Sequence, residues 1–470
     1  MSSWTQICQT KKASILHYES TLEALKANMT LFQYEKISLF KLESGEVLGF
    51  HNDNLEVAQL SSGVWDAAQV GRDSEELEEL KTWSDSINAN VKRSVIEQKI
   101  KTLTINTTQL CNLKCTYCAA GGDGTYGSPT VKLDLKKGLP QLEWLVSRCL
   151  PGEMFQINFL GGEPLLYPDV IREIAEKATE LAQLSQVALR FGVVTNGTLL
   201  STPKILDLLQ KFRIAVTVSV DGPPEVQDRF RPKKNASQAA EGSSVDLEKG
   251  LQALSLIKNK LPSVGLAAVF HKDYLNILET YGYFLKWNFD FYEFNYSHTD
   301  FDLESSQTFA SQLDKVAHMA DSIGGEEELR KIRSFDSILN RLDEQVKLEN
   351  FCGSGKSLLS MDAKGDLYAC PWDINDKSLK ISSATPLSTN NGTSTNHLDS
   401  YRAPQIDKLA CSQCWAKFVC GGGCTYVHNG GGSSESATKV DPIFCERTQS
   451  LIKTMIMYYE KYRRVSNETH

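Results

Sequence analysis

The residues with the most distinctive chemistry are cysteines, which gather in two parts of the chain. The protein has 12 cysteines, and all except Cys8 and Cys149 belong to one of the two groups. The N-terminal segment MSSWTQICQTKKASIL lacks the basic and apolar regions of a secretion signal. We therefore expect a cytoplasmic protein whose thiols stay reduced, and we interpret the two groups as metal ligands. Cys8 and Cys149 are expected to be ordinary core or surface thiols.

The first group is the segment CNLKCTYC, which places Cys111, Cys115 and Cys118 in CxxxCxxC spacing. Three thiolates on one short loop can hold three irons of a [4Fe–4S] cluster and leave the fourth iron without a protein ligand. An open iron implies a ligand from outside the protein. The alternative is a structural zinc site, but zinc normally requires four protein ligands and no fourth Cys or His lies nearby.

The second group lies in a Cys- and Gly-rich region after Phe351 that has weak hydrophobic periodicity. A region of this kind needs cross-links, which bound metal can supply. Zinc remains an alternative here, because CxxC together with CxxxC is compatible with it. The seven cysteines are Cys352, Cys370, Cys411, Cys414, Cys420, Cys424 and Cys445.

Apolar segments alternate with amphipathic ones after residue 100, which predicts repeated βα units and a parallel sheet. Six units favour an α/β fold with a partial (β/α)6 barrel, whose reactive groups lie at the carboxyl ends of the strands. The expected strands are 101–109, 155–161, 187–196, 214–222, 264–270 and 291–297.

The remaining segments suggest smaller domains around this barrel. Within the first 100 residues, the alternating segments between 34 and 51 predict a hairpin, followed by a further strand, a short helix and a charged helix or linker. The expected organisation is an N-terminal α+β domain (1–100), a barrel (101–300), a helical connector (301–350), the cysteine-rich domain (351–450) and a C-terminal helix or tail (451–470).

Composition argues against some partners. The formal net charge is -8 and there is no long Lys/Arg run, so we expect neither nucleic acid nor an anionic membrane as a partner. No stretch of about 18 consecutive apolar residues occurs, so no membrane-spanning helix is expected.

The CxxxCxxC loop directly after the first expected barrel strand resembles the radical S-adenosylmethionine (radical SAM) superfamily. This resemblance implies that the open iron chelates the amino and carboxylate groups of S-adenosylmethionine, and that one electron from the cluster releases a 5′-deoxyadenosyl radical. It also implies cofactor-binding roles for residues at the strand ends. Tyr117 would lie beside the adenine, and the segment Gly161-Gly162-Glu163-Pro164 resembles the family's GGEP motif. The other residues implied are Asn196, Ser219 and Asp221, with Arg231 as a partner for the cofactor carboxylate.

The second cysteine group resembles the SPASM extension of this superfamily, which holds two auxiliary iron–sulfur clusters. By motif position, Cys352, Cys370 and Cys424 would bind the first auxiliary cluster, and Cys411, Cys414, Cys420 and Cys445 the second. The expected total is three [4Fe–4S] clusters. Some relatives have a further cysteine where this chain has Val346, so the first auxiliary cluster either has an open iron or takes Glu349 or Asn350 as its ligand.

Radical SAM and SPASM together resemble enzymes that mature ribosomally synthesised precursor peptides. The loop 119–127 favours a splicease-like outcome, in which a tyrosine-derived fragment is excised; the alternative is a thioether or C–C crosslink. The expected partners are the precursor peptide and an external electron donor of the flavodoxin or ferredoxin type. The hairpin at 34–51 could capture the leader segment of the precursor peptide by strand addition. If it does not, a small leader-binding protein is a further expected partner. The hypothesis from another class is a zinc-stapled protein-binding module without catalysis. Candidate acid–base residues are Tyr296, His298 and Asp300.

Overall fold

The computed structural model describes most of the chain outside the N-terminal segment and several loops. The candidate residues His298 and Asp300 and the loop 119–127 lie outside the described residues, so their predicted roles remain predictions. The described ranges are 29–71, 74–86, 93–94, 99–118, 132–234, 242–297, 302–381, 401–428 and 440–468.

Six parallel strands form the centre of the molecule, as the sequence predicts. Each strand pairs with the next one along the chain, and the sheet order is linear, so the six strands make an open barrel. In β9 (Ile214–Ser219), buried and half-buried side chains alternate, because one face meets the helices and the other faces the barrel interior. The other five strands are β6 (Thr102–Thr108), β7 (Met154–Gly161), β8 (Ala188–Thr195), β10 (Val264–Phe270) and β11 (Phe291–Tyr296).

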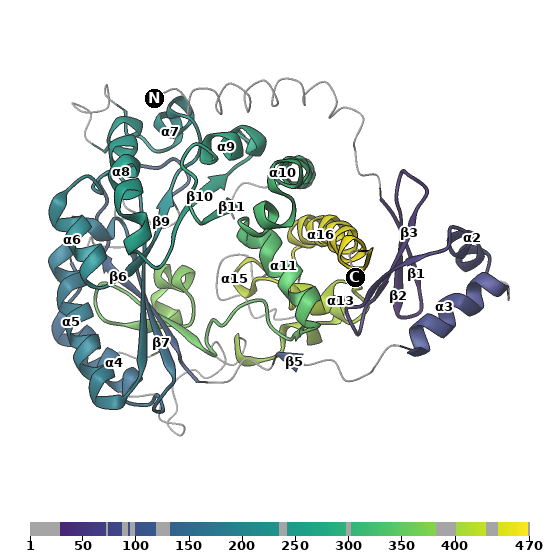
Figure 1. Ribbon diagram of the computed structural model, residues 1–470. Coiled ribbons are helices and arrows are strands. Elements are labelled where there is room, and N and C mark those ends of the chain that lie inside the picture. The colour runs from purple at the N-terminus through teal and green to yellow at the C-terminus, as the bar shows by residue number, and fades with distance from the viewer. Residues whose placement is uncertain are drawn as a thin grey trace.

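Helices follow the strands and cover the outside of this sheet (Figure 1). Helix α5 (Pro168–Ser185) shows how the sequence specifies them. It begins at a proline, buries Ile171, Ile174 and Ala178, and ends where Gln186 adopts the left-handed conformation. The others are α4 (Leu135–Val146), α6 (Pro203–Lys211), α7 (Pro224–Phe230), α8 (Ser244–Ile257) and α9 (Ile277–Phe284).

Two further strands extend the barrel sheet and were not predicted. Strand β13 (Leu358–Met361) pairs in parallel with β6, and β14 (Leu367–Tyr368) pairs antiparallel with β13. The turn between them is specified by the Asp362 side chain, which accepts hydrogen bonds from the backbone N–H groups of Lys364 and Asp366. This hairpin joins the cysteine-rich region to the barrel edge and places Cys370 just after β14.

The N-terminal domain is a four-stranded antiparallel sheet with two helices. The predicted hairpin is present as β2 (Ile37–Lys41) and β3 (Val47–His51), but both are interior strands of the sheet. Neither offers the free edge expected for leader capture, because β1 (Thr30–Tyr34) pairs with β2 and β4 (Val57–Leu60) pairs with β3. The helices are α2 (Gly63–Val70) and α3 (Glu75–Ser86).

The two faces of this sheet have different neighbours. One face packs against α2 and α3 in a small separate core. The other contacts the cysteine-rich domain, where the rings of Phe40 and Phe50 lie 5.3 Å and 6.0 Å from that of Trp415. Since Trp415 directly follows Cys414, the N-terminal domain supports the second cysteine group.

The C-terminal part consists of helices that bridge the domains. Helix α16 (Pro442–Glu468) packs against α10 (Leu303–Arg330) and α11 (Arg333–Glu344), between the barrel and the N-terminal sheet (Figure 1). Helix α10 is interrupted at Gly325, whose φ is 62°. Among the described helices, none combines the length and the apolar character needed to cross a bilayer. The remaining short elements are β5 (Arg93–Ser94), β12 (Lys347–Leu348), α13 (Leu409–Ser412), α14 (Lys417–Cys420) and α15 (Thr425–His428).

Candidate iron–sulfur and cofactor site

The three cysteines of the first group lie on one loop just after β6, at the carboxyl end of the barrel strands. Cys111 and Cys115 are partly buried and Cys118 is exposed. Burial raises the pKa of the Cys111 thiol to about 11 and that of Cys115 to about 12. These thiols therefore keep their protons at neutral pH unless a metal ion replaces them, which fits a metal-ligating role.

A second segment, 230–234, fixes the backbone of this loop. The N–H of Lys114 donates to the carbonyl of Pro232 at 2.8 Å, and the N–H of Thr116 donates to that of Phe230 at 3.0 Å. Leu113 and Lys233 form an antiparallel bridge. Sequence reasoning used this segment only as the source of Arg231 and missed its pairing, because such short pairings carry no hydrophobic pattern.

The Gly161-Gly162-Glu163 segment packs against the start of the loop. A Cβ on Gly161 would lie 2.3 Å from the carbonyl oxygen of Thr108, and one on Gly162 would lie 2.2 Å from that of Leu110. Both positions therefore exclude any side chain. The N–H groups of Gly162 and Glu163 donate to these same two carbonyls at 2.8 Å. The glycines thus place Leu110, and with it Cys111, against the end of β7.

Glu163 is completely buried and connects the ends of β7 and β8. Its carboxylate accepts hydrogen bonds from Leu165 N at 3.0 Å, from the Thr195 hydroxyl at 2.8 Å and from Asn196 N at 2.7 Å. Burial raises its pKa to about 7 despite these donors. The likeness to the GGEP motif implies a contact with the cofactor ammonium group, which would add to these three hydrogen bonds.

Asn196 contacts the cysteine loop directly. Its amide nitrogen donates to the side-chain oxygen of Asn112 at 2.8 Å and lies 3.8 Å from the sulfur of Cys111. Asn112 also donates to the hydroxyl of Thr198 at 2.8 Å. This network links the end of β8 to the first thiol.

Asp221 and Arg231 are buried, and they contact Tyr117, a half-buried residue of the cysteine loop. The Arg231 guanidinium donates to Asp221 at 3.0 Å, and the Tyr117 hydroxyl donates to the same carboxylate. Burial raises the pKa of Tyr117 well above its ordinary value. Arg231 is therefore paired with Asp221. To bind a cofactor carboxylate as well, its guanidinium would have to donate to both carboxylates.

Tyr296 lies at the end of β11, where the barrel meets the cysteine-rich domain. The guanidinium carbon of Arg447 is 3.2 Å from the centre of its ring. Burial raises the pKa of Tyr296 to about 12. A phenol in these surroundings stays protonated at neutral pH, so it could donate a proton but not act as a base.

The seven later cysteines fall into two groups by the electrostatic effects that they have on one another's pKa. Electrostatic interactions connect Cys352, Cys370 and Cys424 with one another. A second set of interactions connects Cys411, Cys414, Cys420 and Cys445. Cys420 and Cys424 belong to the same short stretch but interact with different groups. Which cluster each of them binds stays a prediction from the motif resemblance.

In the part of the chain that the structure describes, no three His, Cys, Asp or Glu side chains converge closely enough to hold a single metal ion. Asn350 is already engaged, because its amide donates to the Ala403 carbonyl at 2.8 Å and accepts from Lys356 at 2.6 Å.

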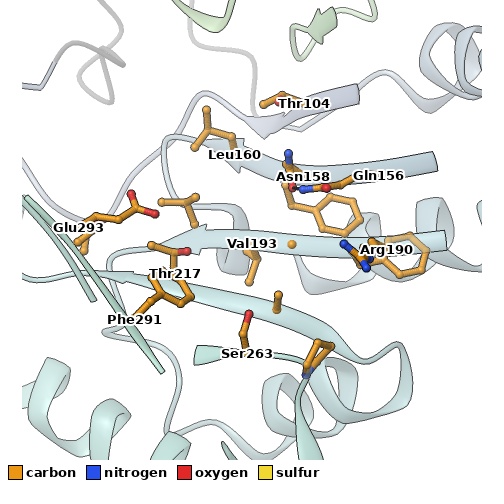
Figure 2. A pocket seen from close by; sticks show the side chains of 18 of the residues that line it. Thr104, Gln156, Asn158, Leu160, Arg190, Val193, Thr217, Ser263, Phe291 and Glu293 are labelled. Carbon is orange, nitrogen blue, oxygen red and sulfur yellow. Dashed lines mark hydrogen bonds between the residues drawn. The ribbon is translucent and has the colours of Figure 1, made fainter. Parts of the chain in front are cut away.

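The barrel interior contains a cavity of about 1040 Å³ with many polar residues in its lining. Figure 2 shows Gln156, Asn158 and Arg190 together on neighbouring strands and Glu293 apart from them. Glu293 is held by Arg333 at 2.7 Å. The predicted cofactor residue Ser219 also lines the cavity, as does Pro371, which follows Cys370. The cavity therefore extends along the barrel interior to the cysteine-rich domain.

Comparison with known proteins identifies the barrel. Residues 105–262 match the Radical SAM superfamily. The chain is 26% identical over 288 residues to the uncharacterized protein MJ0907 of Methanocaldococcus jannaschii, covering 59% of this chain and 90% of that protein. It is 24% identical to the radical SAM cyclopropyl synthase TigE of Paramaledivibacter caminithermalis over 31% of this chain, but spans only 32% of TigE.

Solved structures share the fold over a longer region. The anSMEcpe protein with bound AdoMet superimposes with a TM-score of 0.63 at 18% identity, over 78% of this chain and 95% of that one. The same protein with bound AdoMet and the Kp18Cys peptide gives a TM-score of 0.61. The fold, the family match and the cysteine loop at the carboxyl end of the strands agree: the chain contains a radical SAM domain.

Proposed function

We propose that this protein is a radical SAM maturase that modifies a ribosomally synthesised precursor peptide. The observation that carries the proposal is the position of three thiols, Cys111, Cys115 and Cys118, on a loop at the carboxyl end of a barrel whose interior holds a cavity with both polar and apolar side chains in its lining. Seven further cysteines lie in the domain that contributes Pro371 to the same cavity.

A [4Fe–4S] cluster with bound S-adenosylmethionine would supply one electron to cleave the sulfonium, giving methionine and a 5′-deoxyadenosyl radical that removes a hydrogen atom from the substrate. The protein's own residues position the thiol loop. Gly161 and Gly162 bring the thiol loop against β7, Asn196 holds it at β8, and the segment 230–234 fixes its backbone. Ser219 faces the cavity where the substrate would meet the cofactor.

The cavity and a structural relative support a peptide as the substrate. A volume of about 1040 Å³ is at the upper end for small-molecule pockets, so it has room for a few residues of an extended chain. Its amide, hydroxyl and charged side chains can hydrogen-bond a peptide backbone. The anSMEcpe protein, which shares this fold, has been solved with bound peptides.

The reaction subtype is the finer part of the proposal. From the loop 119–127 we favour splicease-like excision of a tyrosine-derived fragment, and crosslinking through a thioether or C–C bond is the alternative. The proposed partners are an external flavodoxin- or ferredoxin-type electron donor and, because β2 and β3 are interior strands, a small leader-binding protein.

The test is co-expression with a short precursor gene next to this one, followed by mass spectrometry of the peptide. Loss of a tyramine-sized fragment indicates splicing, and loss of two hydrogens indicates a crosslink. The matched control is Cys115→Ala, which should leave the peptide unmodified. An unmodified peptide with the wild-type protein, under conditions in which the protein produces 5′-deoxyadenosine, would contradict the proposal for that peptide.

Metal content tests the alternative of a zinc-stapled binding module. After anaerobic purification we expect a brown protein that absorbs broadly near ~400 nm and contains on the order of twelve irons per chain. A colourless protein that contains zinc would contradict the enzyme proposal.

A further inference from the structure

Lys408 is a buried lysine with an unusual environment. Its side chain is only 9% exposed, and its Nζ atom has no hydrogen-bond partner among the described residues. An ammonium group without a partner is costly to bury, typically by several kcal/mol. Its position therefore requires a source of negative charge.

The nearest candidates for that charge are the thiol groups of both auxiliary sets. Lys408 interacts electrostatically with Cys424 of the first set and with Cys411, Cys420 and Cys445 of the second. Neutral thiols cannot compensate an ammonium group. The same sulfurs as ligands of an iron–sulfur cluster would carry net negative charge, which increases when the cluster accepts an electron.

The backbone of Lys408 fixes this position. Its carbonyl accepts hydrogen bonds from Cys411 N at 2.8 Å and Ser412 N at 3.2 Å, so the residue begins the helical turn that carries Cys411. A nearby lysine differs. Lys417 lies near Cys411 and Cys414, but it is partly exposed and donates to the Ser412 carbonyl at 3.2 Å.

We propose that Lys408 is a buried counter-cation shared by the two auxiliary clusters and that it stabilises their one-electron-reduced forms. The inference rests on the auxiliary clusters of the proposed function. Lys408 is a positioning residue here: it sets the reduction potential of the clusters and touches no substrate. Low local dielectric makes its charge effective, because water does not screen a buried ammonium group.

Redox titration of the full chain tests this role. A background variant with Cys111, Cys115 and Cys118 replaced by alanine retains only the auxiliary clusters, whose reduction can be followed by electron paramagnetic resonance. Lys408→Met in this background should lower the ratio of reduced to oxidised cluster at a fixed potential about tenfold, a shift of about 59 mV for a one-electron couple. Lys408→Arg, which keeps the positive charge, should have reduction potentials close to those of the background variant. Lys417→Met should have a smaller effect, since solvent screens that charge.

The outcomes distinguish a failure of the role of Lys408 from a failure of the auxiliary clusters themselves. Unchanged potentials in Lys408→Met, or equal shifts in Lys408→Met and Lys408→Arg, would overturn the role of Lys408. If Lys408→Met and Lys408→Gln both lose iron while Lys408→Arg keeps it, the positive charge is needed even to hold the clusters, which supports the proposal. Loss of iron from all three would show a packing role instead. Absence of iron from the background variant itself would overturn the auxiliary sites.

Discussion

The two cysteine regions would hold a cluster in different ways. The loop at residues 111–118 carries all three of its thiols on one short segment, and the rest of the barrel only positions that segment. In the region after residue 351, each set draws its thiols from distant segments: Cys352 precedes β13, Cys370 follows β14 and Cys445 lies in α16. The first arrangement would leave the fold independent of the metal, whereas the second would make the metal part of the fold.

The largest expected effect is on catalysis. Cys115→Ala removes one of three ligands at the first site, so reductive cleavage of S-adenosylmethionine should fall to background. Iron should decrease by about four atoms per chain, while the auxiliary clusters and the thermal midpoint remain. Chromatographic measurement of 5′-deoxyadenosine checks this, and wild-type levels would contradict the assignment of the loop.

The corresponding change in the second region should affect the fold. Cys414 lies beside Trp415, against which the N-terminal sheet packs, and its sulfur accepts a contact from Gln449 at 3.6 Å. Cys414→Ala should lower iron content, solubility and activity together and cost at least about 3 kcal/mol of unfolding free energy. Iron analysis and calorimetry measure both quantities. Unchanged iron and melting behaviour would show that the two regions do not differ as described.

A smaller effect is expected from a substitution that displaces the first loop without removing a ligand. The Cβ of Gly162→Ala would meet the carbonyl oxygen of Leu110, so the variant should lose about 3 kcal/mol of stability and part of its first cluster. Gly152→Ala is the matched control: its φ is +83°, and its Cβ would meet no atom within 4 Å. We expect only about 1 kcal/mol there, from backbone strain. Equal losses in iron for both would refute a specific steric role.

The smallest effect concerns pH, for which the two regions should respond in opposite directions. Burial raises the pKa of Glu163 from 4.5 to about 7. Its contribution to stability is therefore complete below pH 4.5 and is lost as the pH rises to about 7. Burial lowers the pKa of His428 from 6.5 to about 4, and its Nδ1 accepts a hydrogen bond from Asp441 N at 2.9 Å. Its contribution is complete above pH 6.5 and is lost as the pH falls to about 4.

Each contribution should amount to about 2–3 kcal/mol. Unfolding midpoints of the wild type and both variants should be measured from pH 4 to 7.5. Glu163→Gln should lose the decrease in stability that occurs as the pH rises, and His428→Gln should lose the decrease that occurs as the pH falls. A change of the same sign in both variants would contradict this account.

The sequence predicted the first region better than the second. The six barrel strands were found because apolar strand-like segments alternate with amphipathic ones along the sequence. The division of the later thiols into two sets comes from motif spacing and stays a prediction. Strand β1 and the β13–β14 hairpin were missed, since segments such as Leu367–Tyr368 are too short to show a period. The pairing of residues 230–234 with the cysteine loop and the burial of Lys408 depend on long-range packing, which local patterns do not encode.

The central claim is that the thiols of residues 111–118 hold a cluster with one iron open to S-adenosylmethionine. Electron paramagnetic resonance of the reduced protein, recorded with and without S-adenosylmethionine, tests it most directly. We predict that the cofactor changes the spectrum of the wild-type protein and leaves that of Cys115→Ala unaltered. A wild-type spectrum that does not respond to saturating S-adenosylmethionine would contradict the account.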